Sequence, residues 1–101
     1  MLGKTLIDLY YALSALGMVR SKRDFSRRFL NRGLTYFRDF EQRNRLGVRV
    51  PFRSVRALRT RLQAISRLLP KATASEVVKL IDQIDRACRI ADQLGYGRKG
   101  R

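Results

Sequence analysis

Residues 20–44 read RSKRDFSRRFLNRGLTYFRDFEQRN, a pattern of two short helices joined by a turn. Ser21, with an acidic residue three positions later, is a helix-start signal. Phe25 and Phe29 follow at helical spacing, one turn apart on the same face. The pattern predicts a helix from about Lys22 to Leu30 with an apolar face that packs against the rest of the chain.

A turn and a further helix follow within the same stretch. Residues 31–33 contain Asn and Gly, the two residue types that best tolerate left-handed backbone, so we expect the first helix to end there. Phe37 and Phe40 share one face of the next helix, predicted over Leu34–Arg45, and pack back on the first pair of rings. Ser26 is the small residue that a close approach of the two helices needs. The opposite face presents polar side chains outward: Thr35, Arg38, Asp39 and Gln42.

The rest of the chain predicts three further helices. An apolar helical repeat begins after a capping-box-like start at Thr5 and ends at Gly17. Residues 46–52 alternate apolar with polar and predict an extended loop, with a short strand possible. Further helices are predicted from a cap at Ser54 to Pro70, and from a capping box at Thr73 to Gly95. The predicted fold class is therefore all-α, with five helices of which the last is long.

The length of 101 residues allows one compact domain and an appendage. We expect residues 1–70 to form the domain, residues 71–95 a helix for dimerisation or partner contact, and residues 96–101 a disordered basic tail. The apolar stripe of the last helix is wider than a small domain needs to cover, which favours contact with a partner. We predict a homodimer with these candidate interface residues: Val77, Ile81, Ile84, Cys88 and Ala91.

Charge is the strongest functional signal in the sequence. There are 23 Lys and Arg residues against 8 Asp and Glu, a net charge of +15. Fifteen of the basic residues lie between Arg20 and Arg67 with three acidic ones, whereas residues 73–94 hold three basic and four acidic residues. The fourth predicted helix has a cationic face with Arg53, Arg56, Arg59 and Arg67. Charge segregated in this way indicates a surface for a polyanion, above all a nucleic acid, although an anionic membrane or an acidic protein would also be attracted.

The residue inventory argues against several classes of function. The chain has one cysteine, Cys88, and no histidine, which excludes an internal disulfide and leaves zinc without its usual ligands. Without histidine, acid–base catalysis would fall to carboxylates, and Asp82, Asp85 and Asp92 read as ion-pairing residues of a solvated helix. We therefore expect no enzyme, no metal and no cofactor. The apolar run near the N-terminus is interrupted by Asp8 and too short to span a bilayer, so we expect a core-facing helix, with export as an alternative, and no membrane partner. The expected location is cytoplasmic and nucleoid-associated.

The order and spacing of helices and loops over residues 5–69 resemble the phage-repressor (Cro/CI-type, lambda-repressor-like) helix-turn-helix family. Phe25-Ser26-x-x-Phe29, followed by Leu30-Asn31, stands where that family has apolar-Ala-x-x-apolar-Gly. The turn looks one residue longer here, with Asn31 at the position of the family's Gly. The sequence PFRSVRALRTRL, residues 51–62, resembles the segment that opens the family's fourth helix.

This resemblance implies a bacterial or phage transcriptional regulator, repressor-like, whose domain over residues 1–70 binds double-stranded DNA and reads the major groove with the helix 34–45. Candidates for base contact are Gly33, Leu34, Thr35, Arg38, Asp39 and Gln42. Resemblance and charge together give the candidates for phosphate contact: Ser21, Lys22, Arg23, Arg27, Arg28, Arg32, Tyr36, Arg43, Arg45, Arg49, Arg53 and Arg56. A homodimer implies an inverted-repeat operator.

Other interpretations of the same residues stay open. Each basic side chain can belong to a solvated helix face, and Tyr36 can be half-buried rather than reach a phosphate. An RNA-binding protein or a nucleoid-associated basic protein without sequence preference would share the charge. A small interaction module that acts on another regulator would instead use the last helix.

Overall fold

The computed structural model describes residues 1–43 and 46–93. Its helical elements follow in the order α1 (Gly3–Ala15), α2 (Lys22–Asp24), the π-helical turn η1 (Phe25–Phe29), α3 (Tyr36–Gln42), α4 (Phe52–Ser66) and α5 (Lys71–Gln93). The segment η1 continues α2 without a break. Over the described residues the predicted all-α class with five helices is confirmed, and the one β feature is an isolated bridge between Leu2 and Arg49.

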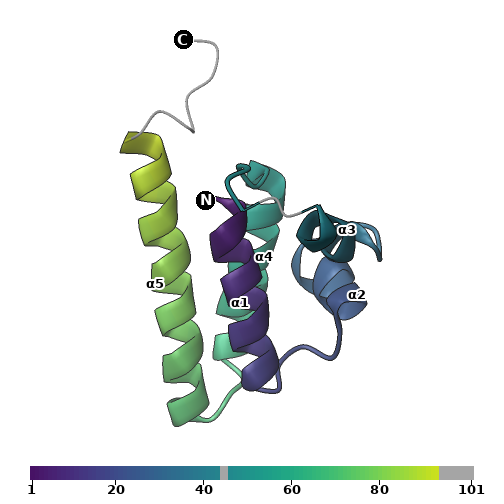
Figure 1. The fold of residues 1–101 in the computed structure, drawn as a ribbon. Coiled ribbons are helices and arrows are strands. Elements are labelled where there is room, and N and C mark those ends of the chain that lie inside the picture. Colours follow the sequence, from purple (N-terminus) through teal and green to yellow (C-terminus); the bar gives the residue numbers. More distant parts are fainter. Residues whose placement is uncertain (44–45, 94–101) are drawn as a thin grey trace.

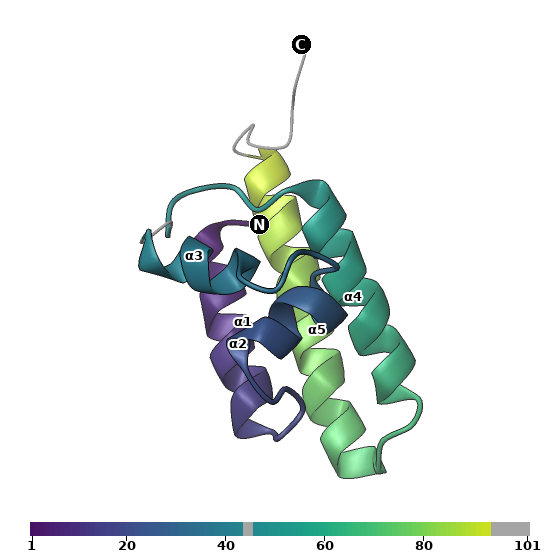
Figure 2. The same ribbon diagram turned by 90° about the vertical axis from the view of Figure 1, so that its right-hand side faces the viewer.

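The helices form three layers (Figure 1). The long helix α5 lies on one side, α1 and α4 lie in the middle, and α2 and α3 lie on the other side. Figure 2 shows α2 and α3 lying over α1 and α4, with α5 behind them. The fully buried core is drawn from all three layers: Leu6, Leu9 and Leu13 of α1, Leu58 and Leu62 of α4, Val77 and Ile84 of α5, and the phenylalanines of the helix pair.

Aromatic rings hold α2, η1 and α3 to each other and to α1. The side chains of Phe25, Phe29 and Phe37 are completely buried, and Phe40 is 6% exposed, as predicted. The rings of Phe25 and Phe37 meet edge to face with centroids 5.0 Å apart. Tyr10 of α1 packs on both, at 5.3 Å from the Phe25 ring and 4.8 Å from the Phe37 ring. Buried aromatic pairs of this kind each add about 0.5–1.5 kcal/mol beyond their burial, so the helix pair is fixed firmly on α1.

The predicted start of α2 is confirmed in its atomic detail. The hydroxyl Oγ of Ser21 accepts the backbone N–H of Asp24 at 3.1 Å. The carboxylate of Asp24 in turn accepts the backbone N–H of Arg20 at 3.0 Å. The turn prediction is confirmed in part, because Asn31 adopts left-handed backbone with φ of 56° whereas Gly33 does not.

Three other helix starts differ from the prediction. The helix expected from Thr5 begins at Gly3, because the N–H groups of Gly3 and Lys4 donate to the carbonyls of Val48 and Leu46 at 2.8 and 3.0 Å. The helix expected from Ser54 begins at Phe52, directly after Pro51, whose fixed φ suits the start of a helix. The last helix begins at Lys71 rather than Thr73.

The third predicted helix is shorter than expected, spanning Tyr36–Gln42 instead of 34–45. Residues 46–50 form the predicted extended loop and run beside the N-terminus of the chain. Val50 N–H donates to the carbonyl of Met1 at 2.9 Å, and the bridge between Leu2 and Arg49 completes the pairing.

The apolar seam of α5 lies inside the protein's own core. Val77 and Ile84 are fully buried, Ile81 is 7% exposed, and Cys88 is half-buried against the same core. The seam expected to meet a second copy is therefore covered by α1 and α4, since α5 packs along both. The side chain of Ala91, the remaining candidate, is outside the described part of the structure.

Candidate nucleic-acid interface

Ser26 is the joint of the predicted helix-turn-helix segment. Its side chain is fully buried, and its Oγ donates to the carbonyl of Lys22 at 2.9 Å while accepting the backbone N–H of Phe37 at 2.9 Å. The carbonyl of Ser26 also accepts the backbone N–H of Arg32 at 2.9 Å. One small residue therefore connects η1, the turn and α3, which sets the direction in which α3 points.

The outward face of the segment is the one expected from the sequence. Phe37 and Phe40 are buried, and Tyr36 is half-buried. All six candidates for base contact are exposed: Gly33, Leu34, Thr35, Arg38, Asp39 and Gln42. Their exposure is confirmed, while their contact with bases stays a prediction.

Three of the basic candidates are engaged within the fold, and two of them, Lys22 and Arg32, connect separate elements. Lys22 of α2 forms an ion pair with Glu41 of α3, whose other oxygen accepts the hydroxyl of Tyr11 of α1 at 2.6 Å. Hydrogen bonds from Lys22 and Tyr11 hold the pKa of Glu41 below its ordinary value, and the bond to Glu41 raises the pKa of Lys22. This triad stabilises the packing of α3 on α1 and α2, so Lys22 is less free for a phosphate than the sequence suggested.

Arg28 and Arg32 are also engaged. Arg28 pairs with Asp24 at 3.0 Å on the same helical segment. Arg32 donates from Nε to the hydroxyl of Ser54 at 2.9 Å, and its guanidinium lies 4.8 Å from the ring centroid of Tyr36. Ser54, expected to be a helix cap, is thus a buried acceptor that ties the turn to α4.

The remaining basic candidates make no ion pair within the described residues. Arg23, Arg27, Arg43, Arg49, Arg53 and Arg56 are exposed, and so is Arg38 on α3. The side chain of Ser21 is used as the helix cap. Arg45 falls outside the described residues.

A cleft of 580 Å³ between the end of η1 and α4 gathers four arginines. Arg53, Arg56 and Arg61 line it from α4, and Arg28 lines it from η1. Arg61 donates from Nε to the carbonyl of Arg28 at 3.1 Å, which holds the two walls together. Thr60 and Asn31 add neutral polar groups, and among the described residues no acid lines this cleft.

Sequence reasoning missed part of this cleft. Thr60, Arg61 and Asn31 were not expected to belong to a site. The sequence feature that could have indicated the residues on α4 is the exposed face of this helix, opposite the buried Leu58 and Leu62. Arg59, expected on the cationic face, instead forms a two-bonded ion pair with Asp85 of α5 at 2.7 and 2.9 Å. That bond raises the pKa of Arg59 and lowers the pKa of Asp85, and the pair joins α4 to α5.

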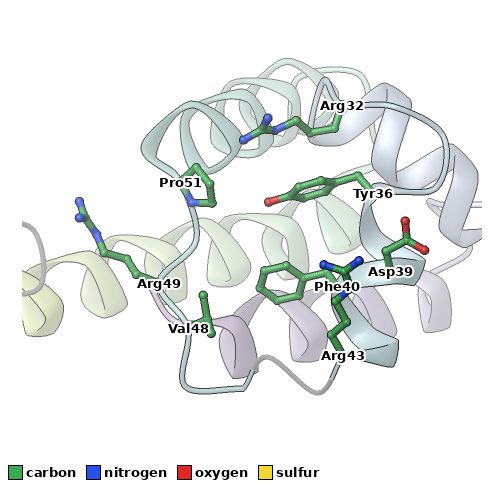
Figure 3. A pocket seen from close by; sticks show the side chains of 8 residues that line it. All are labelled: Arg32, Tyr36, Asp39, Phe40, Arg43, Val48, Arg49 and Pro51. Atoms are coloured by element: carbon green, nitrogen blue, oxygen red, sulfur yellow. The ribbon is translucent and has the colours of Figure 1, made fainter.

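A second hollow lies on the other side of the turn, between α3 and the extended residues 48–51 (Figure 3). Tyr36 and Phe40 of α3 line it together with Arg43, which follows the last residue of α3, and Arg32 closes it from the turn. Arg32 thus borders this hollow and bonds to Ser54, the chain neighbour of the cleft residue Arg53. Arg32 therefore lies between the two concave regions.

Comparisons with family models, with curated proteins and with solved structures gave no match. Among residues 1–43 and 46–93, no three His, Cys, Asp or Glu side chains gather where they could hold a metal ion. In the same part of the chain, no helix combines the length and the apolar character that crossing a membrane requires.

Proposed function

We propose that this protein is a sequence-specific regulator that binds double-stranded DNA with the side of the molecule formed by α2, η1, α3 and the first half of α4. The observation that carries the proposal is the cleft in which four arginines converge, beside a short helix held rigidly outward. Of these four, only Arg28 is paired with an acid within the described residues, and no acid lines the cleft itself. Like charges gathered at one place repel each other in the free protein, and phosphates relieve that repulsion. The resemblance to phage repressors adds the expectation that the second helix of the helix-turn-helix, here α3, contacts the bases.

In this proposal α3 lies in the major groove. Its seven residues have a length of about 10 Å, which suits a groove about 12 Å wide. Arg38 is the candidate for a bidentate contact to guanine, and Gln42 is placed one turn further along the same exposed face. Thr35 lies at the start of this helix, where its side chain can contact either a base or a phosphate of the DNA.

The arginines of the cleft supply affinity rather than sequence preference. Arg53, Arg56 and Arg61 present guanidinium groups from α4, and Arg28 adds a fourth from η1. Guanidinium groups bind phosphate oxygens through paired hydrogen bonds, so the cleft suits one strand of a DNA backbone. Exposed Arg23 and Arg27 extend the same charge along α2 and η1.

Pairing of two copies on an inverted repeat is part of the proposal. One such unit covers only a few base pairs, and two copies on half-sites about 34 Å apart would double the contacts. Because Val77, Ile81 and Ile84 are buried inside each copy, contact between the copies has to use other surfaces. Sedimentation with and without a cognate duplex measures this: two proteins per site support pairing, and one protein per site removes it.

Competition at fixed salt tests the type of nucleic acid. Labelled duplex DNA is displaced by unlabelled duplex DNA, structured RNA and single strands of equal length. The proposal predicts that duplex DNA competes best. Stronger competition by structured RNA would instead support the RNA-binding alternative, and equal competition by all polyanions would support binding without a reader.

A further inference from the structure

We propose that the hollow between α3 and residues 48–51 is a binding site for a nucleoside monophosphate group. The proposal goes beyond duplex binding and does not depend on it, because a mononucleotide has no groove to read. It rests on the aromatic and apolar walls of this hollow and on the charge around its mouth.

The walls fit a flat ring. Tyr36 and Phe40 stand on one side with ring centroids 6.0 Å apart, and Val48 and Pro51 stand on the other (Figure 3). The volume is 380 Å³, within the range of about 300–1,000 Å³ that small-molecule sites occupy. Val48 is 43% exposed although it is apolar, so this wall is open to a ligand. Nucleobases stack on the faces of aromatic side chains, and the half-buried Tyr36 is the more accessible of the two rings here.

The net charge of the residues that line the hollow indicates which chemical group the bound nucleoside carries. Arg32 and Arg43 border the hollow, and Arg49 lies at its outer edge with its side chain extending outward in Figure 3. Asp39 is the acidic residue of the described lining. Three guanidinium groups and one carboxylate leave two net positive charges. A phosphate monoester carries about −1.5 to −2 at neutral pH and matches this balance better than the single charge of a phosphodiester.

The site is largely built before any ligand arrives. Arg32 is held over the Tyr36 ring and by its bond to Ser54, so its position costs little to fix on binding. The backbone of Val48 is held by its carbonyl, which accepts the N–H of Gly3 at 2.8 Å. Arg43 is exposed and free to turn towards a phosphate at the mouth.

The same chemistry can come from two sources, a free nucleotide or the 5′-phosphorylated end of a strand. The test is a titration of the full-length, isotope-labelled protein followed by amide NMR. The probes are adenosine and guanosine monophosphate, the matching nucleosides, inorganic phosphate, and a short oligodeoxynucleotide with and without a 5′-phosphate. Nucleoside monophosphates are expected to shift the amides of residues 36–43 and 48–50, with nucleosides and inorganic phosphate far weaker. Tighter binding of the 5′-phosphorylated strand assigns the site to strand ends, and equal or weaker binding assigns it to free nucleotides.

Two variants and a control make the test specific. Val48→Trp fills the hollow at an exposed position and should abolish the shifts while circular dichroism stays unchanged. Arg43→Ala removes a charge-assisted hydrogen bond and should weaken binding about tenfold or more. Arg56→Ala, in the other cleft, should leave mononucleotide binding unaltered. The proposal is overturned if inorganic phosphate reproduces the shifts, if the shifts centre on residues 53–61, or if Val48→Trp binds as well as the parent chain. Duplex binding can succeed or fail independently of each of these results.

Discussion

The Oγ of Ser26 accepts the backbone N–H of Phe37 at 2.9 Å, in a place where neither side chain has any exposed surface. This contact spans the turn and determines how α3 leaves the helix before it. Because the same hydroxyl donates to the carbonyl of Lys22, the serine bonds to both helical segments at once. The exposed face of α3 therefore depends on a residue that itself contacts no solvent.

Replacing Ser26 with alanine should lower the free energy of unfolding by about 1–3 kcal/mol, because the buried N–H of Phe37 loses its acceptor. Chemical denaturation measures the change. Ser14→Ala, at an exposed position of α1, is the matched control and should stay within about 0.5 kcal/mol of the parent. Equal stability of the two variants would show that the hydrogen bonds of Ser26 do not contribute to the free energy of unfolding.

Arg38 and Arg56 are predicted to differ in kind. Arg38→Ala should lose about 1–3 kcal/mol on a cognate duplex and little on random duplex, since a base contact is removed. Arg56→Ala should weaken both duplexes alike, because a phosphate contact has no sequence information. Binding isotherms on the two duplexes separate the cases. Equal losses for Arg38→Ala on both duplexes would contradict base reading by α3.

The salt dependence of DNA binding should be steep. If about six to ten basic side chains meet phosphates, affinity should fall by about three to five decades between about 50 and 200 mM salt. Arg61→Ala should reduce the slope of log affinity against log salt by about 1. Arg86→Ala should leave the slope unchanged, because this exposed residue belongs to α5, the helix on the side away from α2 and α3 in Figure 1. A response that is flat for the parent chain contradicts the phosphate contacts altogether.

Stability should decline at acid pH through carboxylates that are paired in the fold. Hydrogen bonds from Lys22 and Tyr11 lower the pKa of Glu41 from its ordinary 4.5, and the bond from Arg59 lowers the pKa of Asp85 from 3.8. A lowered pKa in the folded state gives stability that is complete above the ordinary value and is lost as pH falls towards the folded value. Unfolding free energies measured from pH 7 down to about pH 3 should therefore decrease mainly below about pH 5.

The variant Glu41→Gln measures how much of the loss of stability at low pH comes from Glu41. It should be less stable than the parent at pH 7, where the carboxylate is paired, and the difference should shrink as pH falls and the parent's Glu41 becomes protonated. A difference that stays constant over the whole range would place the acid response in other groups.

Local patterns were sufficient for several features of the fold. The spacing of Phe25, Phe29, Phe37 and Phe40 predicted a buried aromatic cluster, which the structure confirms. The cap at Ser21 and the left-handed residue at Asn31 were also predictable, because both depend on residues a few positions apart.

Features that depend on residues far apart in sequence were not predictable in this way. The start of α1 at Gly3 depends on the carbonyls of residues 46 and 48. A capping motif at Thr5 is a local pattern and contains no information about these distant acceptors. Arg59 turns towards α5 because Asp85 accepts two of its hydrogen bonds. The same reason explains the seam of α5, since Val77, Ile81 and Ile84 pack against α1 and α4.

Selection of bound sequences from a random pool of duplexes shows whether the outward face of α3 reads the base sequence of DNA. The parent chain is predicted to enrich an inverted repeat with half-sites about one helical turn apart, and Arg38→Ala to lose the preference at one position of each half-site. A pool that stays random through repeated rounds, although the protein retains duplex DNA in each of them, would contradict the account.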